Sequence, residues 1–171
     1  MLPGAKGKIM QIDEMKNSDT VVFRYAGRED VSTIVALLAD DILGASRESD
    51  NDLAADIYYS AFDDMQTQNG NHYLLAVDQN DAILGCIQLT LIPGLSRAGM
   101  KRAQIEGVRV AKSARGHGIG GKLMNEAHKI ALENGCGLVQ LTTDRTRDDA
   151  LRFYEELGYE NSHHGLKLSF K

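Results

Sequence analysis

The sequence predicts a mixed α/β fold, in which a mostly antiparallel central sheet carries helices on both faces. Short apolar stretches with strand-like alternation are interrupted by longer stretches with apolar residues at helical spacing. Three of the predicted strands follow one another directly, and helices separate the later strands. This order of elements is typical of a three-layer α/β domain.

The folded region is predicted to begin with one strand and two helices. The strand covers residues 21–24. Asp30 is placed to cap the first helix, whose apolar stripe ends before Gly44. The second helix shows apolar residues at helical spacing between positions 54 and 65. Each helix therefore offers one apolar face for packing.

A β-hairpin is predicted next. Residues 72–77 and 83–92 are rich in apolar and β-branched residues, and the polar segment 78–81 between them suits a turn. Pro93 and Gly94 follow the second strand and end it.

The strand after the hairpin has an irregular alternation. Ala103 and Ile105 are apolar at odd positions, whereas Val108 and Val110 are apolar at even positions. Because strand side chains alternate with a period of two, one residue must be extra. Gly107 lies at the slip, so we predict a β-bulge there.

The second half of the chain is predicted to alternate helices and strands. A helix ends at Asn134, a buried strand covers 138–142, and a further helix ends at Gly158. The segment 146–149 has the pattern of a capping box for that last helix, with Asp in place of Glu. Residues 166–170 alternate and are predicted to form a final strand.

Length and composition indicate one soluble domain. We assign residues 21–171 to a single domain and residues 1–20 to an N-terminal extension that is poorly ordered. No apolar run is long enough to span a membrane, and the N-terminus lacks a secretory signal. Only two cysteines occur, Cys86 and Cys136, so a reducing cytoplasm is expected and both are interpreted as small buried residues. The net charge of −5 argues against nucleic-acid binding.

A glycine-rich loop before a helix is the most informative local feature. Gly116, Gly118, Gly120 and Gly121 lie where backbone N–H groups can converge at a helix N-terminus. Unsatisfied N–H groups and the helix dipole together favour an anion at such a place. Four basic residues surround the loop although the chain is acidic, namely Arg109, Lys112, Arg115 and Lys122. A site for a phosphorylated ligand is therefore predicted.

Two other interpretations of this loop are considered. A phosphate-binding P-loop is set aside because Leu123 follows Lys122 where a Ser or Thr is required. Gly116, Gly118 and Gly121 also fit the dinucleotide fingerprint of NAD(P)-dependent oxidoreductases, and Asp144 lies at a suitable distance. That alternative places too many residues between strand and loop, and leaves only 50 residues for the second half of the sheet.

The motif R-x-x-G-x-G, formed here by Arg115, Gly118 and Gly120, resembles the pyrophosphate loop of the GCN5-related N-acetyltransferases (GNAT). The segment 150–159, A-L-R-F-Y-E-E-L-G-Y, is similar to the family's A-x-x-F-Y-x-x-x-G-[FY] pattern. The strand 105–110 resembles the family's central strand. The resemblance extends over nearly the whole chain, from about residue 21 to residue 170.

This resemblance implies an acetyl-CoA-dependent N-acetyltransferase that uses direct transfer to a primary amine. Acetyl-CoA is the implied co-substrate, and no metal is implied. Many relatives have Asn at the position of Arg147, so the contact of that Asn with the cofactor is not expected here. Arg147 or Arg152 is instead expected to contact a phosphate of the cofactor. The predicted cofactor-binding residues are Val108, Arg109, Val110, Arg115, Gly116, His117, Gly118, Ile119, Gly120, Gly121 and Arg147.

Two residues are predicted to carry the chemistry. Glu106 precedes the bulge, and in some relatives a glutamate on this strand relays a proton from the amine; burial would raise its pKa towards a useful value. Pairing with Arg102 or Arg109 is the structural alternative. Tyr154 matches the family's tyrosine that protonates the leaving thiolate, and a core tyrosine is the alternative.

The acceptor stays open at this stage. It is a small-molecule amine or a protein amine, with no nucleic-acid or membrane partner, and a homodimer is left open. A non-catalytic acyl-CoA-binding module with the same fold is a further alternative. Titration of the protein with acetyl-CoA and with NAD(H) separates the two ligand classes.

Overall fold

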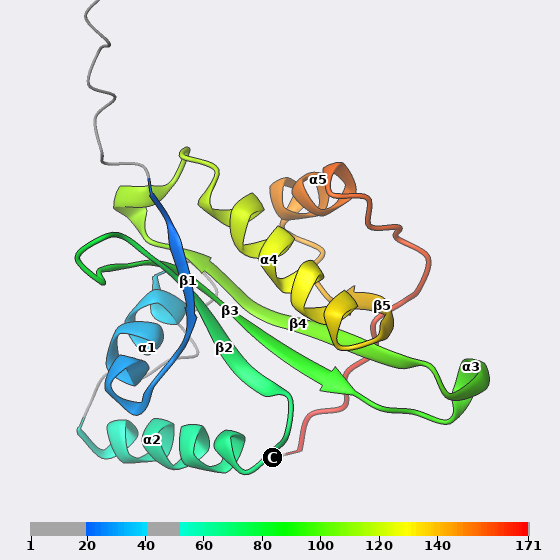
Figure 1. Ribbon diagram of the computed structural model, residues 1–171, viewed down its shortest axis with the longest axis horizontal. Helices are drawn as coiled ribbons and strands as arrows, with labels where there is room; N and C mark the ends of the chain where they lie inside the picture. The colour runs from blue at the N-terminus through cyan, green and yellow to red at the C-terminus, as the bar shows by residue number, and fades with distance from the viewer. Residues whose placement is uncertain (1–19, 41–51, 171) are drawn as a thin grey trace, which may run out of the picture.

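The computed structural model of the protein describes residues 20–40 and 52–170. Within these ranges a five-stranded sheet in the order β1-β2-β3-β4-β5 is surrounded by helices (Figure 1). The strands are β1 (Val22–Tyr25), β2 (Asn71–Val77), β3 (Ile83–Ile92), β4 (Lys101–Val110) and β5 (Cys136–Leu141). The helices are α1 (Val31–Ala39), α2 (Asp52–Gln66), α3 (Ser96–Gly99), α4 (Ile119–Glu133) and α5 (Asp148–Glu156).

The sheet is mixed, as predicted. Strands β1 to β4 pair antiparallel with their neighbours, and only β4 and β5 pair in parallel. This topology confirms the predicted fold class. It also shows that the NAD(P)-dependent alternative was wrong, because the dinucleotide-binding fold requires a mostly parallel sheet.

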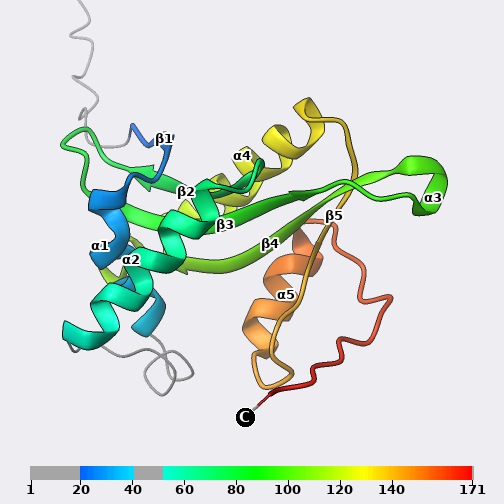
Figure 2. The same cartoon turned by 90° about the horizontal axis from the view of Figure 1, so that it is seen from below.

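Each face of the sheet has its own apolar core. Helix α4 packs across one face, where Leu123, Met124 and Ala127 are fully buried (Figure 1). Helix α1 covers the other face at one end of the sheet, where Ile34 contacts the cluster that contains Cys86. Seen at right angles, α5 lies below β4 in the view, and its Phe153 and Tyr154 pack against the core under α4 (Figure 2). Helices thus occupy both faces, as predicted.

The predicted β-bulge is present in β4. Cys86 pairs with Arg109 and Gln88 pairs with Glu106, so two residues of β4 oppose one residue of β3. Gly107 lies between them with φ of 59°, in the left-handed region that favours glycine. A Cβ on Gly107 would lie 3.3 Å from the hydroxyl of Tyr73. The backbone conformation therefore favours glycine here, and the space for a side chain is tight.

Two local predictions were wrong. Residues 166–170 form no strand, and the side chains of Leu166 and Phe170 are each 91% exposed. No capping box forms before α5, because Thr146 hydrogen-bonds to the carboxylate of Asp144 instead. Alternation and capping patterns are local signals, and neither specifies the tertiary partner that would complete the element.

Some predictions concern residues outside the described ranges. The predicted end of the first helix near Gly44 lies there, as does nearly all of the N-terminal extension 1–20. None of the described helices is long and apolar enough to cross a membrane.

The structure also adds an element that no pattern predicted. This is α3, at the tip of the long β3–β4 hairpin, which contains Arg97 and Ala98 in the left-handed region (Figure 1).

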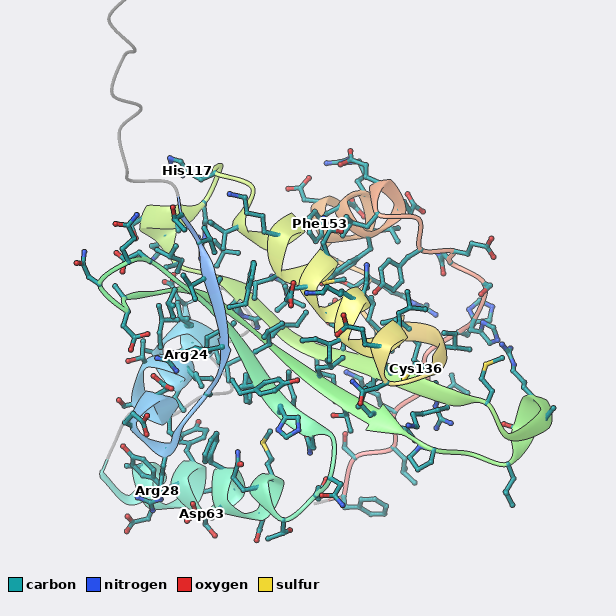
Figure 3. All side chains as sticks on the ribbon, viewed as in Figure 1. Arg24, Arg28, Asp63, His117, Cys136 and Phe153 are labelled. Carbon is teal, nitrogen blue, oxygen red and sulfur yellow. The ribbon has the colours of Figure 1, made fainter. Side chains whose placement is uncertain are left out.

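A buried ion pair joins the start of the sheet to α1. Asp30 is 6% exposed and accepts two hydrogen bonds from the guanidinium of Arg24, at 2.7 and 2.9 Å. It also accepts one from the backbone N–H of Gly27. Nearby, Arg28 pairs with Asp63 of α2 at 3.1 Å (Figure 3). The hydrogen bond from Arg24 is the main reason that the pKa of Asp30 lies below its usual value.

We predict that Asp30→Asn destabilises the protein by about 3 kcal/mol at neutral pH, because it removes one partner of a buried ion pair. The lowered pKa stabilises the fold fully above the unfolded pKa of about 3.9, and this contribution is lost as pH falls through the folded pKa. Urea unfolding from pH 7 down to pH 3 should therefore show the difference between variant and wild type shrinking. Asp81 also contacts Arg24 but is largely exposed, so Asp81→Asn is the matched control and should cost under about 1 kcal/mol. Equal costs for both variants would contradict this assignment.

Candidate functional site

The glycine-rich loop forms an open cavity at the N-terminus of α4. Gly116 and Gly118 have φ of 79° and 72°, and Gly118 is the N-cap residue, with no side chain capping the helix. The first N–H groups of this 15-residue helix are thus left for another acceptor. The cavity has a volume of about 230 Å³ and is lined by Val110, Ala114, Arg115, Gly116, Gly118, Ile119, Gly120, Gly121 and Phe153.

Because glycines line this cavity, no side chains fill the space above their backbone. A Cβ added to Gly116, Gly118 or Gly121 would have no protein atom within 4 Å, so it would project into open space. A Cβ on Gly120 would lie 3.5 Å from the ring of Phe153. Figure 3 shows His117 at the outer tip of the loop and Phe153 on the side of α5 that faces α4. The arrangement suits a phosphate that approaches the backbone closely.

Two of the predicted loop cations are held by α1. Asp40, the C-cap residue of α1, pairs with Lys112 at 2.5 Å and with Arg115 at 3.1 Å. Arg115 also donates from Nε to the carbonyl of Val110, at 3.1 Å. The nitrogen Nδ1 of His117 lies 2.9 Å from the carbonyl of Arg115. These contacts fix the loop between the end of β4 and α1.

The second half of β4 has an open edge beside the cavity. Pairing between β4 and β5 ends at Ile105 and Leu141. From Glu106 to Val110, the described structure pairs β4 with β3 alone. The guanidinium of Arg109 donates to the carbonyl of Val108 at 2.9 Å, and so it occupies one acceptor along this edge. An extended ligand arm can follow the remaining backbone groups.

Glu106 lies on the sheet face opposite to α4, directly across from Gln88. Its side chain is exposed. In the described part of the chain Glu106 forms no ion pair, and its proposed structural pairing with Arg102 or Arg109 is absent. The carboxylate is therefore accessible to water and to a ligand.

Tyr154 is half-buried on α5, where its ring contacts those of Phe153 and Tyr159 edge to face. Burial raises the pKa of its hydroxyl, and the positive charges of Arg147 and Arg109 oppose that rise. The hydroxyl is consequently protonated at neutral pH and can donate a proton or a hydrogen bond. Arg109 on β4 and Arg147 at the start of α5, both predicted site residues, thus act on the hydroxyl of Tyr154.

The cysteines are unsuited to nucleophilic catalysis. Cys86 is fully buried, and burial raises the pKa of its thiol to about 12. Burial also raises the pKa of Cys136. Because the thiolate is the nucleophile, neither group is activated. Covalent transfer through a cysteine is therefore disfavoured.

The structure adds residues that sequence reasoning missed. Phe153 lines the loop cavity, a contact that its place in the segment 150–159 did not indicate. Asp40 was not among the predicted site residues, and its contacts with Lys112 and Arg115 show that it anchors the loop. No spacing rule could connect Asp40 to Arg115, since 75 residues separate them.

Comparison with known proteins identifies the class. The model of the acetyltransferase (GNAT) family matches residues 20–159. The aminoalkylphosphonate N-acetyltransferase of Salmonella typhimurium is 31% identical over 144 residues, which cover 82% of this chain and 85% of that protein. The chain therefore belongs to the GNAT family of acetyltransferases.

Solved structures agree with this assignment. A crystal structure described as a transcriptional regulator from Bacillus halodurans is 44% identical, with a TM-score of 0.84, covering 88% of this chain and 100% of that one. A putative acetyltransferase from Agrobacterium tumefaciens is 27% identical, with a TM-score of 0.76, covering 87% and 99%. The predicted family and the enzyme class, an N-acetyltransferase, are confirmed.

Proposed function

We propose that the protein transfers an acetyl group from acetyl-CoA to a small-molecule primary amine. The main observation behind this proposal is the glycine-lined cavity at the N-terminus of α4, where no side chain caps the helix. This cavity lies next to the open edge of β4. The first feature suits a pyrophosphate and the second suits an extended arm. The residues present therefore fit acetyl-CoA, which supplies a thioester whose carbonyl carbon accepts the amine.

The residues that hold the cofactor divide between loop and strand. The N–H groups of 116–121 would bind the pyrophosphate, with Arg115 and His117 at the rim. The carbonyls of Val108 and Val110 already accept from Arg109 and Arg115, so the backbone N–H groups of Val108 and Val110 would donate to the pantetheine arm. Arg109 and Arg147 lie close enough to Tyr154 to affect its pKa, so their charges would stabilise a thiolate formed beside its hydroxyl.

Two residues would move the protons. An ammonium cannot attack a carbonyl carbon, so the acceptor must first lose a proton, and exposed Glu106 would take it through water. As the carbon–sulfur bond breaks, the hydroxyl of Tyr154 would donate to the departing sulfur. The two groups lie on different elements, β4 and α5. Beyond Ile105, β4 is no longer paired with β5, and the reacting groups would lie beside this open edge.

The acceptor is proposed as a small molecule rather than a protein lysine. The relative named aminoalkylphosphonate N-acetyltransferase supports this choice, since its named acceptor class is a small amine. Calorimetric titration with acetyl-CoA, followed by a thiol-release assay over a panel of amines, tests the whole proposal. Tight binding without acetylation of any amine would favour a non-catalytic acyl-CoA-binding module.

We predict that Gly121→Ile weakens CoA binding more than tenfold, a loss of about 1.4 kcal/mol. Gly121 is helical and its Cβ would meet open space, so the new side chain would fill the cavity without straining the fold. Calorimetry gives the affinity and urea unfolding gives the stability. Lys129→Ile, two turns further along α4 at an exposed position, is the control and should bind CoA normally. A folded Gly121→Ile variant with unchanged CoA affinity would show that the phosphates do not bind at this loop.

For Glu106 we predict that the change to Gln lowers turnover ~100-fold, the usual scale of general-base catalysis. The loss should be largest well below the pKa of the acceptor amine, where little free amine exists, and CoA affinity should stay the same. A pH–rate profile measures both effects. Glu133→Gln, at an exposed position on α4, serves as the control. A profile with wild-type height and shape would assign Glu106 no part in proton transfer.

Tyr154→Phe removes the hydroxyl and keeps the ring packing, so its stability should change little. We predict a rate decrease of ~10-fold or more, because the thiolate loses its proton donor. Acyl donors whose thiol has a lower pKa need less protonation, so the decrease should be smaller with them. Tyr59→Phe on α2 is the control. Equal losses with all donors would mean that Tyr154 only positions the cofactor.

A further inference from the structure

A row of polar side chains crosses the sheet beside Glu106. Asn71, Thr90, Gln104 and Gln140 lie directly opposite one another on β2, β3, β4 and β5, and we call them the amide row. Apolar neighbours such as Leu89 and Ile105 pack under α4. Because strand side chains alternate between faces, the amide row lies on the opposite face, which it shares with Glu106.

One end of the amide row is fixed internally. Asn71 is 7% exposed, and its carbonyl oxygen accepts hydrogen bonds from Gln88 at 3.0 Å and Thr90 at 3.2 Å. Its amide nitrogen donates to Gln68, just beyond α2, at 2.9 Å. These contacts orient Gln88 and Thr90 on the face that carries Glu106.

The other end of the amide row is open for hydrogen bonding. Gln140 donates to the carbonyl of Gln104 at 2.8 Å, and the Gln104 amide itself reaches only the backbone carbonyl of Ile105, at 3.4 Å. Among the described residues, no donor reaches the side-chain carbonyls of Gln88 and Gln140. Gln140 is exposed and Gln104 is half-buried. Each amide carries both a donor and an acceptor, whichever way it is turned.

This combination matches hydroxyl groups, which also donate and accept. A phosphate only accepts and an ammonium only donates, so either would leave half of these groups without a partner. An apolar acceptor would displace the water that hydrates the amides without forming hydrogen bonds to them. This costs roughly 1–3 kcal/mol per group. The distance along β4 from Glu106 to Gln104 is two residues, or about 6.8 Å, which is the length of a chain of about six carbons.

We propose that the acceptor is a polyhydroxylated primary amine, an amino sugar or amino alditol, whose hydroxyl groups hydrogen-bond to Gln88, Gln104 and Gln140 while its amine lies at Glu106. This inference rests on the proposed acetyl transfer at Glu106. It makes Gln88 and the open end of the amide row, Gln104 and Gln140, a specificity-determining surface of the acceptor site. This surface separates hydroxylated amines from alkyl amines of the same length.

Glucamine and hexylamine test the proposal, because both are six-carbon primary amines and only the first carries hydroxyl groups. With rates referred to the free-amine concentration, kcat/KM should be at least ~10-fold higher for glucamine. Gln104→Leu should lower the glucamine value ~10-fold, mainly through KM, and leave hexylamine unchanged. Gln140→Leu, at an exposed position, should act in the same direction. Gln79→Leu in the β2–β3 turn is the matched control and should change neither value.

Equal kcat/KM for the two amines, or an equal loss with both in Gln104→Leu, would overturn the inference. Calorimetric binding of glucamine to the CoA-saturated protein separates it from the proposed function. Binding that Gln104→Leu weakens, without acetylation of any amine, supports the acceptor class and contradicts acetyl transfer. Acetylation of hexylamine with neither binding nor acetylation of glucamine supports acetyl transfer and contradicts the acceptor class. Absence of glucamine binding together with absence of all acetylation overturns both.

Discussion

The interruption of strand β4 is the constraint on which the rest of the site depends. A sheet normally satisfies both edges of an inner strand, and here β5 pairs with β4 only up to Ile105. The bulge at Gly107 then adds one residue and changes the direction of the strand. As a result Glu106 faces one side, Val108 and Val110 join the core under α4, and the backbone between them is left for a ligand.

The interruption is maintained by packing from both sides. Tyr73 of β2 and Leu38 of α1 lie over Gly107, at 3.3 and 3.4 Å from the position of a Cβ. On the other side, α5 places Phe153 and Tyr154 against the core that α4 forms. The open edge of β4 thus lies between two packed walls. Such a shape holds its hydrogen-bonding groups in place before a ligand arrives, which favours binding.

The positive charge beside the loop is also positioned by a contact between distant residues. Asp40 holds Lys112 and Arg115 beside the loop, so these cations are positioned although the chain carries a net charge of −5. On the far face of the sheet, the amide row lies next to Glu106. The glycine-rich loop thus carries a cationic rim, and uncharged hydrogen-bonding side chains lie next to Glu106 on the other face of the sheet.

The sequence by itself determined the features that depend on local chemistry. Alternation located β2 and β3, the slip at Gly107 predicted the bulge, and four glycines before a helix predicted the anion site. The tertiary structure decided what depends on contacts between distant residues. Exposure of Glu106, the anchoring of Arg115 by Asp40 and the four-strand amide row all require the register of the sheet. The alternating segment 166–170 shows the same limit, because a strand needs a neighbour and periodicity cannot supply one.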